Sequence, residues 1–135
     1  MHAIISSRRW RAVKKDLSSE QMAEMFEEVA SYFSLLCEPT RLKILHAVCY
    51  GERSVGDIVA DVGSTQANVS RQINMLYRAK ILARRKEGTQ IYYRVDDEKT
   101  IELCRSVCGR IAEEVVARQE MATALGAARK VAENI

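Results

Sequence analysis

Residues 54–79 read SVGDIVADVGSTQANVSRQINMLYRA, and this stretch decides the fold of the chain. Ser54 is suited to cap one short helix and Gly63 to end it. A second helix is predicted over residues 66–79, because Val69, Ile73 and Leu76 follow helical spacing. Two short helices joined by a tight turn that contains glycine are typical of a helix-turn-helix.

The hydrophobic period changes directly after the second of these helices. Residues 81–86 and 89–95 are predicted to form a β-hairpin with Glu87 and Gly88 at its turn. β-Branched and aromatic residues crowd its second strand, as a half-buried strand favours. The sequence therefore predicts a mainly α fold with a β-hairpin wing, that is, a winged helix-turn-helix.

Three more helices are predicted around this unit. An amphipathic helix begins after Ser18 or Ser19, and a second spans Pro39 to Val48. We expect the second to bury Leu42, Leu45 and Cys49, with Ile44 and Val48 beside them. A long last helix begins at Asp96 or Asp97 and could run past Leu125. It carries an apolar heptad pattern at Ile101, Cys104, Cys108, Ile111, Val115, Ala122 and Leu125.

The heptad pattern indicates that the last helix packs against another helix along its length. A second subunit is the natural partner, so we predict a dimer through the first and last helices. The chain divides into a basic N-terminal arm (1–17), the winged helix-turn-helix domain with its dimerisation helices (18–128) and a C-terminal tail (129–135).

Composition places the chain among soluble globular proteins, since 47% of its 135 residues are hydrophobic and 29% are charged. No apolar run is long enough to span a membrane, and the N-terminus lacks a secretory apolar region, so we expect a cytoplasmic protein.

The formal net charge is +3. Residues 64–94 hold seven basic residues and one acidic residue, so this window carries +6 and the rest −3. Such a basic block indicates a binding site for a polyanion.

The predicted residue 66–79 helix carries short polar side chains at its N-terminal end, as a helix that reads the DNA major groove requires. Asparagine and glutamine can pair with adenine and arginine with guanine, whereas serine and threonine can contact phosphate. A plain solvated helix face is the alternative. The predicted contacts on this helix are Ser64, Thr65, Gln66, Asn68, Ser70 and Arg71. Asn68 is a weaker candidate among them, and Gln72 is a further weak candidate.

The predicted wing has a basic strand end at Arg84, Arg85 and Lys86. A wing tip beside the reading helix would reach the adjacent DNA backbone or minor groove, where these cations neutralise phosphates. Double-stranded operator DNA is therefore the predicted partner.

Enzyme chemistry is not indicated by the sequence. The chain has only two histidines and no glycine-rich phosphate loop, and Cys104 and Cys108 lack the Cys-x-x-Cys spacing of a redox enzyme. A winged helix that mediates only protein interactions is a second alternative. The +6 window argues against it, and salt-dependent binding to duplex DNA would separate the two.

Several segments, in this order, resemble the ArsR/SmtB family of winged-helix repressors. They are residues 38–45 (EPTRLKIL), 54–58 (SVGDI), 66–73 (QANVSRQI), 84–88 (RRKEG) and 91–94 (IYYR), and the similarity spans residues 22–115. The resemblance implies a dimer built on the first and last helices that binds operator DNA and is released by a metal ion or a thiol modification.

The family's known effector sites do not transfer to this sequence. The thiolate motif of the arsenic- and cadmium-type members would lie near residues 54–58, where there is no cysteine. Neither His2 nor His46 lies on the last helix, where the zinc-type members have carboxylates and histidines. The reactive cysteines of the persulfide-sensing members would fall at His46 and near Ala112.

The four cysteines leave three interpretations open. Cys104 and Cys108 share one helical face, so they could bind a thiophilic ion such as As(III), Cd(II) or Hg(II), with Cys37 as a third thiolate. Alternatively they could form a disulfide across the dimer or react as a redox sensor, or they could serve only as small buried residues. Cys49 is expected in the core, and His46 is expected to be structural. No required cofactor is predicted, and the effector is predicted to be a soft metal or metalloid such as As(III) or Cd(II).

Overall fold

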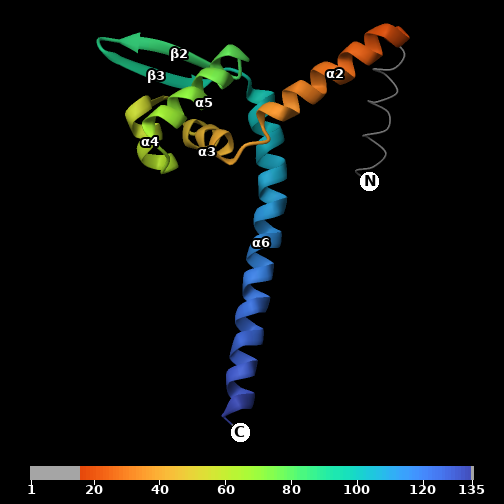
Figure 1. Ribbon diagram of the computed structural model, residues 1–135, viewed down its shortest axis with the longest axis vertical. Helices are drawn as coiled ribbons and strands as arrows, with labels where there is room; N and C mark the ends of the chain where they lie inside the picture. Colours follow the sequence, from red (N-terminus) through yellow and green to blue (C-terminus); the bar gives the residue numbers. More distant parts are fainter. Residues whose placement is uncertain (1–15, 135) are drawn as a thin grey trace.

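The computed structural model describes residues 16–134, so most of the predicted basic arm lies outside it. Within these described residues, five helices and three short strands follow one another in the order expected for a winged helix-turn-helix (Figure 1). They are α2 (Ser19–Leu35), α3 (Pro39–Val48), β1 (Arg53–Ser54), α4 (Val55–Val62), α5 (Gln66–Arg78), β2 (Leu82–Glu87), β3 (Gln90–Val95) and α6 (Glu98–Glu133).

Local capping chemistry sets most of the helix boundaries. Ser18 and Gln21 form a capping box at α2, in which each side chain accepts from the other's backbone amide at 3.1 and 3.0 Å. Ser54 Oγ accepts from the Asp57 amide at 3.2 Å and begins α4, which Gly63 ends with a φ of 71°. These positions confirm the predicted helix-turn-helix boundaries.

The wing is part of a three-stranded antiparallel sheet with the strand order β1-β3-β2. The hairpin is confirmed: Leu82 pairs with Val95 at its base and Glu87 with Gln90 at its tip. The edge strand β1 was not predicted. Arg53 pairs with Tyr93, so β1 joins the start of α4 to the base of the wing.

One apolar core lies between α3, α4, α5 and the base of the sheet. The prediction for α3 was partly wrong, because Leu42 and Cys49 are only half-buried. Both line a pocket between α3 and α6, and Cys49 also packs against the edge of the core. The core consists of Ile44, Leu45, Val48, Ile58, Val62, Val69, Ile73, Leu76, Ile81, Leu82, Tyr93 and Ile101.

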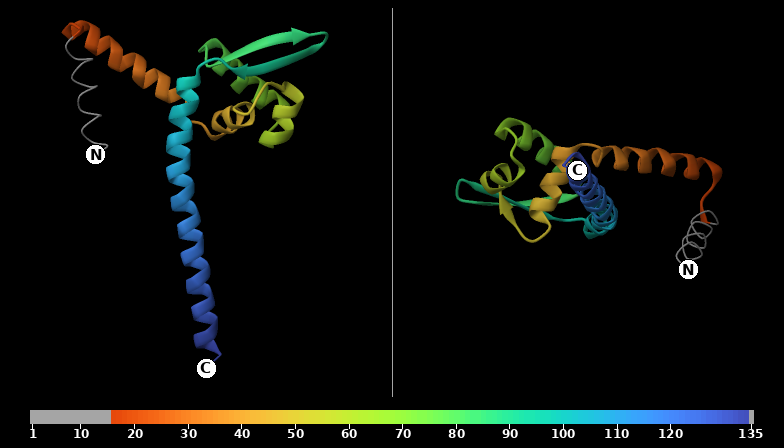
Figure 2. Two further views of the ribbon diagram at one scale, coloured as in Figure 1. Left: turned by 180° about the vertical axis from the view of Figure 1, so that it is seen from behind. Right: turned by 90° about the horizontal axis from the view of Figure 1, so that it is seen from below.

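Helices α2 and α6 project away from the winged body (Figures 1 and 2). Helix α2 has no buried residue, and α6 buries only Thr100 and Ile101 at its start. Both helices nevertheless expose large apolar side chains, among them Val29 and Phe33 on α2 and Ile111 and Leu125 on α6. No helix of the described residues is long and apolar enough to cross a membrane.

Candidate DNA-binding surface and thiol pocket

The N-terminal end of α5 places its polar side chains in two groups. Thr65 caps the helix, since its hydroxyl oxygen accepts from the Asn68 amide at 3.2 Å. Gln66 is exposed on the first turn, and Ser70 is half-exposed one turn later. Thr65 thus orients the helix end, whereas Gln66 and Ser70 are available to an approaching ligand.

Asn68 lies at the centre of a hydrogen-bonded cluster on α5. Its Oδ1 accepts from Arg71 at 2.9 Å and from Gln72 Nε2 at 3.3 Å, and its Nδ2 donates to Ser64 Oγ at 3.0 Å. Gln72 is buried, whereas Arg71 is exposed. The cluster therefore holds one terminal nitrogen of the Arg71 guanidinium, Nη2, while the Arg71 side chain stays exposed to solvent.

The three basic residues of strand β2 have different surroundings. Arg84 lies over the Tyr77 ring, with its guanidinium carbon 4.1 Å from the ring centroid. A hydrogen bond with Tyr93 raises the pKa of Arg84. Lys86 is exposed and has no ionic or hydrogen-bonded partner within residues 16–134, so its charge is available to a polyanion.

Arg85 is held by two carboxylates. Its guanidinium lies 2.6 Å from Glu52 and 2.6 Å from Glu87, and it stacks over the Tyr92 ring at 4.6 Å. The hydrogen bonds that Arg85 donates to Glu52 and Glu87 raise the pKa of its guanidinium above the ordinary value. Because Glu52 precedes β1, the ion pair between Arg85 and Glu52 joins the wing to the body of the domain. The positive charge of Arg85 is balanced by the two carboxylates.

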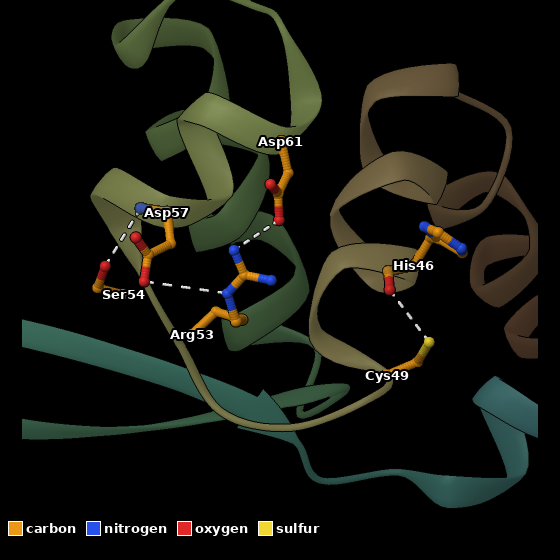
Figure 3. A network of polar contacts seen from close by, with 6 residues as sticks. All are labelled: His46, Cys49, Arg53, Ser54, Asp57 and Asp61. Atoms are coloured by element: carbon orange, nitrogen blue, oxygen red, sulfur yellow. Dashed lines mark hydrogen bonds and ion pairs between the residues drawn. The ribbon is translucent and has the colours of Figure 1, made fainter.

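A second arginine joins β1 to α4. Arg53 lies 2.7 Å from Asp61 and 3.9 Å from Asp57, as Figure 3 shows beside the Ser54 cap. The same view shows Cys49 at the end of α3, with its Sγ donating to the His46 carbonyl oxygen at 3.0 Å.

A pocket of about 420 Å³ lies between α3 and α6, and three of the four cysteines line it. Cys49 caps the C-terminal end of α3, and Cys104 and Cys108 come from α6. His46 and Arg105 supply polar groups, and the remaining wall is largely apolar. Cys108 also lines a neighbouring pocket of about 700 Å³. The structure thus brings the predicted pair Cys104 and Cys108 together with Cys49.

The thiols differ in exposure. Cys104 is half-buried. Its burial raises the pKa of its thiol, and the neighbouring Cys108 adds a smaller effect in the same direction. Cys108 and Cys37 are exposed, but Cys37 lies between α2 and α3 and is not part of the pocket wall.

Within residues 16–134, no group of three or more His, Cys, Asp or Glu side chains is arranged so that it could hold a metal ion. A soft ion would therefore need a rearrangement, a second subunit or an external ligand to complete its coordination.

Sequence reasoning missed several of these residues. Arg41 and Glu52 were not singled out, although each makes short contacts with a group more than thirty positions away in sequence. Gln72, a weak candidate for a DNA contact from the sequence, is instead buried. Its position next to Ile73 and three residues after Val69, at the edge of the buried stripe of α5, was the available signal.

Comparison with known proteins agrees with this geometry. Residues 38–83 match the model of the bacterial regulatory protein, arsR family. The HTH-type transcriptional regulator Rv0081 of Mycobacterium tuberculosis, itself uncharacterized, is 32% identical over 108 residues, which cover 77% of this chain and 95% of that protein. The chain belongs to the ArsR family. Members of this family are DNA-binding transcriptional regulators and not enzymes, so the predicted class of protein is confirmed.

Solved structures extend the likeness to the whole winged domain. The homodimeric winged helix-turn-helix DNA-binding domain of Mb0332 from Mycobacterium bovis is 28% identical, covers 73% of this chain and 90% of its own, and superposes with a TM-score of 0.61. The antimony-specific transcriptional repressor AntR is 30% identical, covers 73% of this chain and 86% of its own, and has a TM-score of 0.62. The predicted fold class of this ArsR-family regulator is thus confirmed.

Proposed function

We propose that this ArsR-family regulator is a homodimeric repressor that binds operator DNA through α5 and the wing. The observation that carries this proposal is the position of Gln66, Ser70 and Arg71 on the open end of α5, with the uncompensated Lys86 on the adjacent wing. A helix of this kind enters the major groove with its N-terminal end, and a wing cation contacts the flanking phosphates.

The dimer is proposed through α2 and α6. Both helices expose apolar side chains that a monomer would leave in water, and the Mb0332 domain, which has the same fold, is homodimeric. A two-fold dimer presents two copies of α5 to half-sites about 34–36 Å apart, so the operator is expected to be a palindrome.

The binding proposal is tested with fluorescently labelled duplexes. The promoter fragment upstream of the protein's own gene is compared with a shuffled duplex of equal length and composition. We expect tighter binding to the promoter, with an affinity that falls steeply with salt. Equal affinity for both duplexes would contradict sequence-specific binding, and no salt-dependent binding at all would favour a protein-interaction module.

We further propose that thiols of the α3–α6 pocket sense the effector. Cys104 and Cys108 are the central pair, because they lie one helical turn apart on the same wall. A soft metal or metalloid is the proposed effector class, since thiolates prefer such ions and AntR is antimony-specific. Oxidation to a disulfide or persulfide is the second candidate, favoured by the exposure of Cys108.

The third thiol is the point on which the sequence and the pocket differ. Cys37 was the candidate from sequence, whereas Cys49 lines the pocket with the other two thiols. A ligand held by Cys49 and the α6 pair would pull α3 toward α6. Because α3 also packs against α5, such a shift would change how the two copies of α5 meet the DNA.

Serine variants separate these assignments in a DNA-release assay. Cys104→Ser with Cys108→Ser is expected to keep operator binding and to abolish release by the effector. Cys49→Ser is expected to weaken release, whereas Cys37→Ser serves as the control outside the pocket. Loss of release in Cys37→Ser alone would restore the set Cys37, Cys104 and Cys108. Loss of operator binding in the double variant would show that the thiols serve the fold.

A further inference from the structure

Arg41, at the start of α3, reaches two other helices with one guanidinium group. Its Nε donates to the Leu35 carbonyl at 2.6 Å and its Nη2 to the Ser34 carbonyl at 3.2 Å, both at the C-terminal end of α2. Its Nη1 donates to Gln72 Oε1 at 2.6 Å, on α5. Arg41 thereby supplies the cation that favours the C-terminal end of α2, whose own last turn has no basic residue.

The hydrogen bonds continue from Gln72 along α5 toward the N-terminal end of that helix. Gln72 Nε2 donates to Asn68 Oδ1 at 3.3 Å, Asn68 Nδ2 donates to Ser64 Oγ at 3.0 Å, and Arg71 donates to the same Asn68 Oδ1 at 2.9 Å. An unbroken chain of hydrogen bonds therefore joins the end of α2 to the exposed Arg71.

The polarity of this chain follows from Arg41. A guanidinium group has only donors, so Gln72 must present its oxygen to Arg41 and its NH₂ group to Asn68. Asn68 must then present its oxygen to Gln72, which leaves that same oxygen as the acceptor for Arg71. Reversing either amide would place two donors or two acceptors against each other in a partly buried site.

The same bonds decide which residue is free to read a base. Asn68 Oδ1 already accepts two hydrogen bonds, which fill its two lone-pair positions. It therefore cannot also accept from adenine N6 in the bidentate contact that asparagine makes with that base. Arg71 has one donor committed to Asn68, and its remaining donors face outward.

We propose that Arg41 and Gln72 are positioning residues that hold Asn68 and, through it, orient Arg71 toward DNA. This relay, the chain Arg41–Gln72–Asn68–Arg71, rests on the proposed operator binding. It assigns the contact with guanine or phosphate to Arg71 and gives Asn68 a supporting role. It also ties that contact to the end of α2, a helix of the proposed dimer interface.

A double-mutant cycle on the full-length dimer tests the relay, with the promoter duplex and the shuffled duplex as probes. Arg71→Ala is expected to weaken promoter binding about tenfold or more. Arg41→Lys keeps the charge but cannot span three acceptors, and it is expected to weaken binding about threefold to tenfold. Once Arg71 is alanine, Arg41→Lys is expected to change affinity by less than about twofold, because the group it positions is gone.

Gln72→Glu gives a second cycle if Arg41→Lys does not fold. The carboxylate of this variant still accepts from Arg41 but cannot donate to Asn68, so the relay is cut in the middle. Its effect on affinity is also expected to vanish in the Arg71→Ala background. Arg53→Lys is the matched control, since Arg53 makes ion pairs with Asp57 and Asp61 and no contact with the relay. It is expected to change affinity by less than about twofold.

The outcomes separate the relay from the proposed function. If the fold-losses in promoter affinity of Arg41→Lys and Arg71→Ala multiply in the double variant, the relay is overturned. Wild-type affinity in Arg71→Ala would overturn it as well. A base preference altered by Asn68→Ala in the Arg71→Ala background would also overturn it, because Asn68 would then read DNA itself. A wild-type protein that binds both duplexes equally would overturn the proposed function, and the relay with it.

Discussion

The hydroxyl of Tyr32 donates to Thr100 Oγ1 at 2.6 Å and so joins the last turn of α2 to the start of α6. Thr100 is fully buried, and its own hydroxyl donates to Asp97 Oδ2 at 2.8 Å. Asp97 is the N-cap of α6. The two helices that project from the winged body are therefore joined by a partly buried hydrogen bond between hydroxyl groups, at the point where they leave that body.

Tyr32→Phe is expected to lower the free energy of unfolding by about 1 kcal/mol, because one partly buried hydrogen bond is lost while the ring remains. Urea unfolding at a fixed protein concentration measures this change, since a dimer's stability depends on concentration. Tyr50→Phe is the control: Tyr50 is 84% exposed, and its change should stay within about 0.5 kcal/mol. Equal losses in both variants would show that the Tyr32 hydroxyl does not fasten α2.

Lys86 and Arg85 are expected to contribute differently to DNA binding although they are neighbours. Lys86→Ala should reduce the slope of log K against log salt by about 0.9, the effect of one lost phosphate contact. Arg85→Ala should change the slope by less than about half of that, because Glu52 and Glu87 already balance its charge. Anisotropy titrations over a range of salt concentrations give both slopes, and a larger change for Arg85→Ala would contradict the assignment.

Ile111→Glu is expected to dissociate the dimer, since it places a charge within the exposed apolar row of α6. Ser106→Glu is the matched control, because position 106 lies opposite the heptad seam on the same helix. Sedimentation velocity measures both. A dimer that persists in Ile111→Glu at micromolar concentration would show that this part of α6 is not in the interface.

The thiols are expected to alkylate in the order of their exposure. At pH 7.5, Cys37 and Cys108 should react with iodoacetamide before Cys49 and Cys104, as measured by peptide mass spectrometry. Since the pKa of Cys104 is raised, its reaction should accelerate only at more alkaline pH. The reverse order would contradict the burial of Cys104.

The raised pKa of Cys104 also makes the stability of the fold depend on pH. The folded protein holds the Cys104 proton more tightly than the unfolded chain does. The Cys104 thiol therefore contributes to the free energy of unfolding at pH values below the unfolded thiol's pKa of about 8.5. This contribution to stability is lost as pH rises through the folded-state pKa. Binding of a soft metal must displace that proton, so effector affinity is expected to rise with pH.

Much of the fold followed from the sequence because its signals are local. Ser54, Gly63 and Thr65 act on amides within a few residues, and the alternating strand pattern marked the wing. The features that sequence reasoning missed depend on partners far along the chain. Strand β1 exists because Arg53 pairs with Tyr93, and Gln72 is buried because Arg41 satisfies its oxygen.

The candidate site divides in the same way. Arg71 and the α6 thiol pair could be singled out from composition and helical spacing. The balanced charge of Arg85 and the place of Cys49 in the pocket could not, because Glu52 and the α3–α6 packing are supplied by the tertiary structure.

The most direct test of the proposed switch is a titration of the reduced protein on its labelled promoter duplex. As(III), Cd(II) and Zn(II) are added in turn, followed by a disulfide or persulfide donor, while anisotropy reports the bound fraction. We predict release by As(III) or Cd(II) at concentrations where Zn(II) has no effect, and no release in the Cys104→Ser, Cys108→Ser double variant. Release by the oxidants alone would replace metal sensing by a redox switch. A complex that survives every addition would contradict thiol sensing and leave the cysteines as packing residues.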